Sequence, residues 1–376
     1  MNITELEKIA KQIKKYQLED EIRDIENWLG KLNKKQIKNF ISLEIYPLKP
    51  IVKLKRLLVS AKALNGDYYL EDIKLINEAK NVGIACYLSD VSMDANSLES
   101  EYHREDMKLI ADEKNPGKAN WLSNVAMNAN SLESEHHRED MKLIADSKNS
   151  GKANYLSDVS MNVNSLESEH HREDMKLIAD VKKNVIANYL RDVSMNVNSL
   201  ESEHHREDMK LIADAKNDVI ANYLSSVSMD ADSLESEYHR EDMKLIADAK
   251  NDVIANYLSS LSKSVYSLES EYHREDMKLI ADAKNSGIAN YLSSLSKSVN
   301  SLESEHHKED MKLIADAEDT RAANEIYDNI IKQYEVKNKK DYVTFQEKID
   351  AIHQNAVEYA DGDTTKELND SVFTLK

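Results

Sequence analysis

A 34-residue repeat constrains this chain more than any other feature of its sequence. The tetrapeptide Ser-Leu-Glu-Ser recurs at a constant spacing and starts at Ser97, Ser131, Ser165, Ser199, Ser233, Ser267 and Ser301. A divergent copy precedes the series over 67–96, and the last copy departs from the pattern after Ala317. Repeats of this length are typical of solenoids, in which each unit buries its apolar face against its neighbours. We therefore predict about eight stacked units with atypical units at both ends.

Each copy contains two stretches of helical periodicity. The first begins at an Asn or Asp that precedes Ser-Leu-Glu, as at Asn96, which predicts a side-chain-capped helix start. The second follows a Lys-Asn pair, such as Lys250-Asn251, with apolar residues again at helical spacing. Only 7 Gly and 3 Pro occur in 376 residues, which is too few for a sheet protein with many turns. The predicted fold class is all-α, an α-solenoid of stacked 34-residue helix-turn-helix repeats.

Charge and periodicity divide the chain into three predicted regions. Residues 1–66 lie outside the repeat, contain 14 Lys or Arg against 8 Asp or Glu, and are predicted to form a basic N-terminal helical cap. The repeat array is predicted over 67–334. Residues 335–376 are predicted to form a C-terminal capping helix, stopped near Gly362, and a polar tail. The net charge of the whole chain is −19, so the part after residue 66 carries −25.

Composition and motifs exclude several classes of function. An acidic array repels phosphate backbones, so we do not expect a nucleic-acid partner along it. We see no apolar stretch of about 18 residues and expect no membrane span. The single cysteine, Cys86, excludes an internal disulfide and favours a reducing compartment, so we expect a cytoplasmic protein. We find no phosphate-binding Gly-rich loop, nucleophile elbow, HExxH or CxxC, and therefore expect neither an enzyme nor a cofactor.

One copy shows the pattern of the repeat fully: Asn-x-Leu, then a His, then Met-x-Leu-Ile-Ala-x-Ala-Lys, then Ala-x-Tyr. The residues are Asn198, Leu200, His205, Met209, Leu211, Ile212, Ala213, Ala215, Lys216, Ala221 and Tyr223. This pattern resembles a class of uncharacterised bacterial 34-residue helical-hairpin repeats. The period and hairpin also resemble tetratricopeptide repeats over about 67–330, but the side-chain consensus differs. The resemblance implies a bacterial protein with stacked hairpins and supplies no activity.

The chemically unusual feature is a histidine on the apolar face of the first helix of each repeat. It recurs as His103, His137, His171, His205, His239, His273 and His307. An Asp follows three residues later, as Asp106 follows His103. Polar groups on a buried face need hydrogen-bond partners, so we expect a ladder of bonds from each His to an Asp or to the next repeat.

Two other roles for this histidine ladder stay open. A metal ladder is one, although zinc sites need three or four ligands and no cysteine contributes, so we predict no metal ligand. A response to pH is the other, since protonating all 12 His would move the net charge from −19 to −7. Four repeats place a second His directly before the first, namely His136, His170, His204 and His306, and others have Tyr there.

Two further columns are predicted to lie on the surface. A charged stripe, Glu101, Arg104, Glu105 and Lys108 with their copies, is predicted to be a solvated helix face with ion pairs between residues three or four apart. A column of Asn on the second helix could read a peptide backbone. Its members are Asn120, Asn154, Asn188, Asn222, Asn256 and Asn290.

These observations favour a non-enzymatic scaffold that presents ladders of equivalent side chains to a protein or peptide partner. The histidine ladder and the Asn column are the candidate binding residues. The alternatives are a nucleic-acid-binding helical array and a metal- or pH-responsive histidine array. The sequence sets neither the partner, the binding face nor the oligomeric state.

Overall fold

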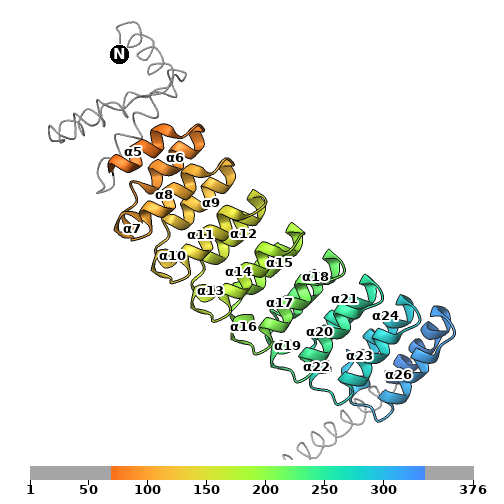
Figure 1. The fold of residues 1–376 in the computed structure, drawn as a ribbon. Helices are drawn as coiled ribbons and strands as arrows, with labels where there is room; N and C mark the ends of the chain where they lie inside the picture. Colours follow the sequence, from red (N-terminus) through yellow and green to blue (C-terminus); the bar gives the residue numbers. More distant parts are fainter. Residues whose placement is uncertain (1–68, 335–376) are drawn as a thin grey trace, which may run out of the picture. The chain divides into compact units, whose positions relative to one another are not determined.

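The computed structural model describes residues 69–334, and their regular structure is helical, with no strands (Figure 1). The all-α class and the helical repeat are therefore confirmed. The predicted caps over 1–66 and 335–376 lie outside the described residues. The chain divides into two compact units, Met1–Ala247 and Asp248–Lys376.

Each repeat contains three helices rather than the predicted two. In the first unit the short helices are α7 (Ala95–Glu99), α10 (Ala129–Glu133), α13 (Val163–Glu167), α16 (Val197–Glu201) and α19 (Ala231–Glu235). The middle helices are α5 (Tyr69–Glu78), α8 (His103–Asp112), α11 (His137–Asp146), α14 (His171–Asp180), α17 (His205–Ala213) and α20 (His239–Asp248). The third helices are α6 (Val82–Val91), α9 (Pro116–Ala126), α12 (Ser150–Ser160), α15 (Asn184–Ser194) and α18 (Asp218–Val227).

The second unit repeats the same order of helices. Its short helices are α22 (Val265–Leu268) and α25 (Val299–Leu302), and its middle helices are α23 (His273–Asp282) and α26 (His307–Asp316). Its third helices are α21 (Asp252–Leu261) and α24 (Ser286–Leu295), and residues 320–334 are also helical.

The predicted helix starts are right for the third helix and two residues late for the short helix. α21 starts directly after the Lys250-Asn251 pair, as expected, and the Asn251 side chain caps it by accepting the backbone N–H groups of Val253 and Ile254. The short helix α7 is capped by Asp94, whose side chain accepts the Ser97 N–H at 3.0 Å. The predicted cap Asn96 lies inside α7, so that expectation was wrong. The helices α10, α13, α16 and α19 are likewise capped by the residue at the position of Asp94, which is Asn128, Asn162, Asn196 or Asp230.

Within each unit, the core of a repeat lies between its middle and third helices. In the repeat that starts at α7, the buried side chains are Met107 and Ile110 of α8 and Ala119, Leu122 and Val125 of α9, each with no exposed surface. Third helices pack on one another, since α9 contacts both α6 and α12, and α15 contacts both α12 and α18. The short helices also contact one another from α7 to α19. Within the first unit the short helices therefore line one edge (Figure 1).

Lysine side chains also tie neighbouring repeats together. Lys118 Nζ donates to the carbonyls of Ala145 and Ser147 at 2.5 and 3.2 Å, at the end of α11. In the second unit, Lys284 Nζ donates to the carbonyls of Asp316 and Ala317 at the end of α26. A cation at a helix C-terminus satisfies carbonyls that have no partner within the helix and opposes the negative end of the dipole.

Candidate functional site

The break between the short and middle helices builds the polar site of each repeat. In a continuous helix, residues six apart lie about 9 Å along the axis and on different faces. Here the backbone leaves the helix at Ser100, whose hydroxyl accepts the Tyr102 N–H at 3.1 Å. Such a side-chain bond to the backbone competes with helix continuation. The break brings Ser97 Oγ within 2.9 Å of Nδ1 of His103.

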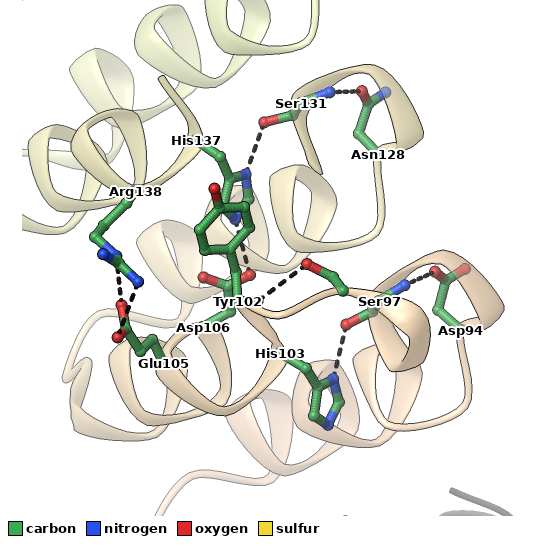
Figure 2. A network of polar contacts seen from close by, with 11 residues as sticks. Asp94, Ser97, Tyr102, His103, Glu105, Asp106, Asn128, Ser131, His137 and Arg138 are labelled. Atoms are coloured by element: carbon green, nitrogen blue, oxygen red, sulfur yellow. Dashed lines mark hydrogen bonds and ion pairs between the residues drawn. The ribbon is translucent and has the colours of Figure 1, made fainter. Parts of the chain in front are cut away.

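In the first unit, each histidine of the ladder then reaches back to the preceding repeat. His137 Nε2 lies 2.9 Å from Oδ2 of Asp106, while its Nδ1 lies 3.0 Å from Ser131 Oγ (Figure 2). We call this set the Ser–His–Asp row. In the first unit its further members are Ser97–His103–Asp72, Ser165–His171–Asp140, Ser199–His205–Asp174 and Ser233–His239–Asp208. In the second unit Ser301 and Asp276 bind His307, and Ser267 binds His273.

The predicted hydrogen-bonded ladder is therefore present, and it runs between repeats. Each Asp of the row bonds to a histidine 31 residues further on, and not to the histidine three residues before it in its own helix. All seven ladder histidines have no exposed surface, and the serines bound to them have none either. A ligand that reached these rings would have to displace the existing bonds.

The row ends on a tyrosine where no further histidine follows. The Tyr334 hydroxyl donates to Asp310, the carboxylate that a next histidine would otherwise take. Burial raises the pKa of Asp106 and of Asp276 above the usual range, against the lowering effect of the bonds from His137 and His307. The row therefore consists of strongly desolvated groups that hold one another in place.

The connectivity differs from that of a catalytic triad. In a serine hydrolase the carboxylate binds Nδ1 and the nucleophilic hydroxyl binds Nε2, whereas in this row the two nitrogens are exchanged. The hydroxyls are also closed off from solvent. Within the described residues, no three His, Cys, Asp or Glu side chains converge so as to hold a metal ion. The arrangement can join repeats and position backbone, and it offers no exposed nucleophile.

A second column of rings covers the row. Within each unit, the residue before a ladder histidine can stack on the ladder histidine of the next repeat, and we call the residues that do so the outer column. His136, His170 and His204 lie with ring centroids 4.8, 4.8 and 4.9 Å from those of His171, His205 and His239. Tyr102 lies on His137 at 4.8 Å with a more tilted ring (Figure 2), and Tyr272 lies on His307 in the same tilted way at 4.8 Å. The outer column thus shields the buried pairs from solvent.

The outer column borders a groove in the surface along the short helices. Two successive hollows lie there, one at His136 and one at His170 and His204. Val163 and Val197, each 44 % exposed, line them together with Leu166 and Leu200. The carboxylates of the Ser-Leu-Glu-Ser-Glu segments line them as well, and we call the whole feature the carboxylate groove. Those carboxylates are Glu133, Glu135, Glu167, Glu169, Glu201 and Glu203.

The groove carboxylates differ from those of the charged stripe. Stripe residues pair between repeats, as Arg138 Nε binds Glu105 at 2.9 Å and Arg172 binds Glu139 at 2.9 Å. The predicted pairs within one helix were therefore wrong for this stripe, because the facing residue of the next repeat is closer. We call these pairs the exposed Arg–Glu row. In the described chain no Lys or Arg forms an ion pair with the six groove carboxylates, although Arg172, Arg206 and Arg240 of the stripe also line the hollows.

The predicted Asn column lies on the third helices, away from the groove lining. Asn222, Asn256 and Asn290 are exposed, and Asn120, Asn154 and Asn188 are half-buried. Asn188 Nδ2 donates to Asp192 within α15, at 3.4 Å. The structure does not bring the Asn column and the histidine ladder together, because they belong to different helices with different surroundings.

Two sets of residues were missed by the sequence reasoning. The first serine of Ser-Leu-Glu-Ser is the second partner of each ladder histidine, and its strict recurrence was the available signal. The two glutamates of Ser-Leu-Glu-Ser-Glu line the groove, and they recur equally strictly. Their grouping could not be recognised because the break after the short helix was not predicted.

Comparison with known proteins adds no relative to this description, because no family model, no curated protein and no solved structure matches the chain. The resemblance to bacterial 34-residue repeats thus stays a prediction from the residues. Between residues 69 and 334, no helix combines the length and apolar character needed to cross a membrane.

Proposed function

We propose that this protein is a non-enzymatic interaction scaffold that binds an extended, Lys- or Arg-bearing segment of a protein partner in the carboxylate groove. The observation that carries the proposal is the recurrence of the hollow, with equivalent residues lining it in successive repeats. Side chains that recur at each repeat suit a ligand that is itself extended, because one segment then meets the same contacts several times. The single cysteine of the chain fits a cytoplasmic setting.

The chemistry of the groove selects the partner. Two glutamates per repeat stand without a Lys or Arg partner, and one exposed valine per hollow lies beside them. A segment with alternating basic and apolar residues would match both. The carboxylates outnumber the guanidinium groups in both hollows. An excess of negative charge raises the local concentration of cationic ligands and repels phosphate backbones, which favours a basic polypeptide over nucleic acid.

Binding of a labelled peptide of alternating Lys and Val, measured by fluorescence anisotropy, tests the proposal. We expect the Lys–Val peptide to bind with an affinity that falls as salt is raised, and a matched Glu–Val peptide to show no binding. A variant with E167Q, E169Q, E201Q and E203Q should lose at least about tenfold in affinity. The control variant D112N, D146N, D180N and D214N removes the same number of exposed carboxylates, none of them lining the groove.

Equal losses in the two variants would show only a general charge effect and would overturn the groove assignment. The same assay with labelled single-stranded DNA and RNA separates the nucleic-acid alternative. Tight binding of either one by the unmodified chain, with no binding of the Lys–Val peptide, would replace a protein partner by a nucleic acid.

A further inference from the structure

The outer column differs chemically between repeats, and this difference falls on the groove. His136, His170 and His204 occupy consecutive repeats, whereas the repeats at Tyr102 and Tyr272 have a ring that does not titrate near neutral pH. Both described hollows lie at the histidine-bearing repeats. Different repeats of the chain thus have either a histidine or a tyrosine in the same position of the outer column, and only the histidine titrates near neutral pH.

The bonding of the Ser–His–Asp row assigns the protons of the inner rings. A neutral His171 that donates from Nε2 to Asp140 and accepts at Nδ1 from the Ser165 hydroxyl uses each of these polar atoms once. A second proton, on Nδ1 of His171, would face the hydroxyl hydrogen of Ser165. That hydroxyl would then have to turn and could no longer donate to Nδ1.

Two of the outer histidines, His136 and His170, have a buried ring nitrogen without a hydrogen-bond partner while they are stacked. In both rings this nitrogen is Nδ1. Their Nε2 atoms face Glu135 and Glu169 at 3.8 Å, too far for a hydrogen bond. A proton on Nδ1 would become a buried donor without an acceptor, which is unfavourable. A ring rotated out of the stack into the groove would expose that donor to water.

Charges of both signs face the outer rings from every neighbouring element, so charge alone does not decide the outcome. The stacked inner rings and their Asp partners lie behind them. In front are carboxylates and guanidinium groups of the groove, from the short helices, the middle helices and the turns between them: Glu133, Glu135, Glu167, Glu169, Arg172, Glu173, Glu201, Glu203, Arg206, Glu207 and Arg240. The unpartnered Nδ1 is the feature that separates the stacked from the rotated state.

We propose that His136 and His170, together with His204 at the equivalent stacking position, form an acid-sensitive clasp, in which protonation releases the outer rings from the stack and turns them into the carboxylate groove. The stacked state then binds fewer protons than the released state, so it loses stability as the pH falls. Released imidazolium rings also add positive charge beside the groove carboxylates. As far as ligand binding is concerned, this inference rests on the proposed function, and acid is expected to release a basic segment.

The tyrosine-bearing repeats provide the opposite trend. Burial raises the pKa of Asp106 and Asp276, which pair with the histidines beneath Tyr102 and Tyr272. A carboxyl whose pKa is raised on folding stabilises the folded state as the pH falls towards its unfolded pKa, and this contribution is lost as the pH rises through its folded pKa. Lowering the pH therefore stabilises the folded state through these two carboxyls, which is opposite to the loss of stability expected from the outer histidines.

The melting temperature of the full chain without ligand, at pH 7.5 and at pH 5.0, tests the clasp. The variant H136Y, H170Y and H204Y places at each site the residue that the chain already uses at Tyr102 and Tyr272. We expect its melting temperature to fall on acidification by at least about 4 °C less than that of the unmodified chain, with the difference developing between about pH 7 and 5. The reverse variant Y102H and Y272H should lose more than the unmodified chain.

Parallel losses in all three proteins would overturn the clasp, since the remaining titratable groups are common to them. The variants are compared only after the circular dichroism at pH 7.5 shows equal helix content. Anisotropy with the Lys–Val peptide at pH 5.0 then tests the link to binding: the unmodified chain should lose several-fold more affinity than the triple Tyr variant. Failure of peptide binding at pH 7.5 would defeat the proposed function and leave the melting comparison valid.

Discussion

Two rows of polar pairs join the same repeats, and they differ mainly in their access to water. His171 and Asp140 pair across one repeat boundary with 0 % and 2 % of their side chains exposed. Arg172, which follows His171, and Glu139, which precedes Asp140, pair across the same boundary with 53 % and 52 % of their side chains exposed. Charged or polar groups in water gain little from pairing, whereas buried ones are costly to leave unpaired. The comparison predicts that neighbouring contacts with the same spacing make very different contributions to stability.

The largest effect is expected from removing the carboxylate of one buried pair. In Asp140→Ala, Nε2 of His171 would be left buried without an acceptor, and the loss of unfolding free energy should be about 3 kcal/mol, at the upper end of the cost of a buried group left without its partner. Urea unfolding followed by circular dichroism measures it. Asp140→Asn keeps an acceptor oxygen and should lose clearly less, and equal losses in the two variants would contradict this explanation.

The serine of the row should have an intermediate effect. Ser165→Ala would leave Nδ1 of His171 buried without a partner, with an expected loss of about 1–3 kcal/mol. Ser157 provides the control, because it is equally buried and its hydroxyl has no partner in the described structure. Ser157→Ala should therefore be close to neutral in the same urea experiment. A larger loss for Ser157→Ala than for Ser165→Ala would show that burial, and not the hydrogen bond, sets the cost.

A smaller effect should follow from the cap of the short helix, which positions the serine of the row. Asn162 accepts the Ser165 N–H at 3.0 Å, so Asn162→Ala should lose about 1 kcal/mol. Asn164 occupies the position that the sequence predicted as the cap, and Asn164→Ala should change the melting temperature little. The opposite ranking would restore the predicted cap and contradict the structure.

The smallest effect is expected in the exposed Arg–Glu row. Arg172→Ala should lose at most about 1 kcal/mol, and the loss should shrink in high salt, because the pair is half exposed. Thermal unfolding at 50 mM and 500 mM salt measures both. A salt-independent loss as large as that of Asp140→Ala would remove the difference between the two rows.

The repeat, its helical class and the hydrogen bonding of the ladder histidines could be predicted from the sequence, because each depends on local period and residue type. The sequence could not show which Asp binds each histidine. His137 has Asp140 three residues later in its own helix and Asp106 in the preceding repeat, and only the structure shows that Asp106 is the partner. The break at Ser100 was missed because its cause, a serine hydroxyl that accepts a nearby N–H, leaves no mark on apolar periodicity. The groove depends on that break and was missed with it.

A pair of double-mutant cycles tests the central comparison most directly. One cycle combines His171→Ala with Asp140→Ala, and the other combines Arg172→Ala with Glu139→Ala, with unfolding free energies from urea denaturation. We predict a coupling energy of about 2 kcal/mol or more for the buried pair and about 0.5 kcal/mol or less for the exposed pair. Equal coupling energies, or a larger value for the exposed pair, would contradict the conclusion that the buried Ser–His–Asp row holds the repeats together.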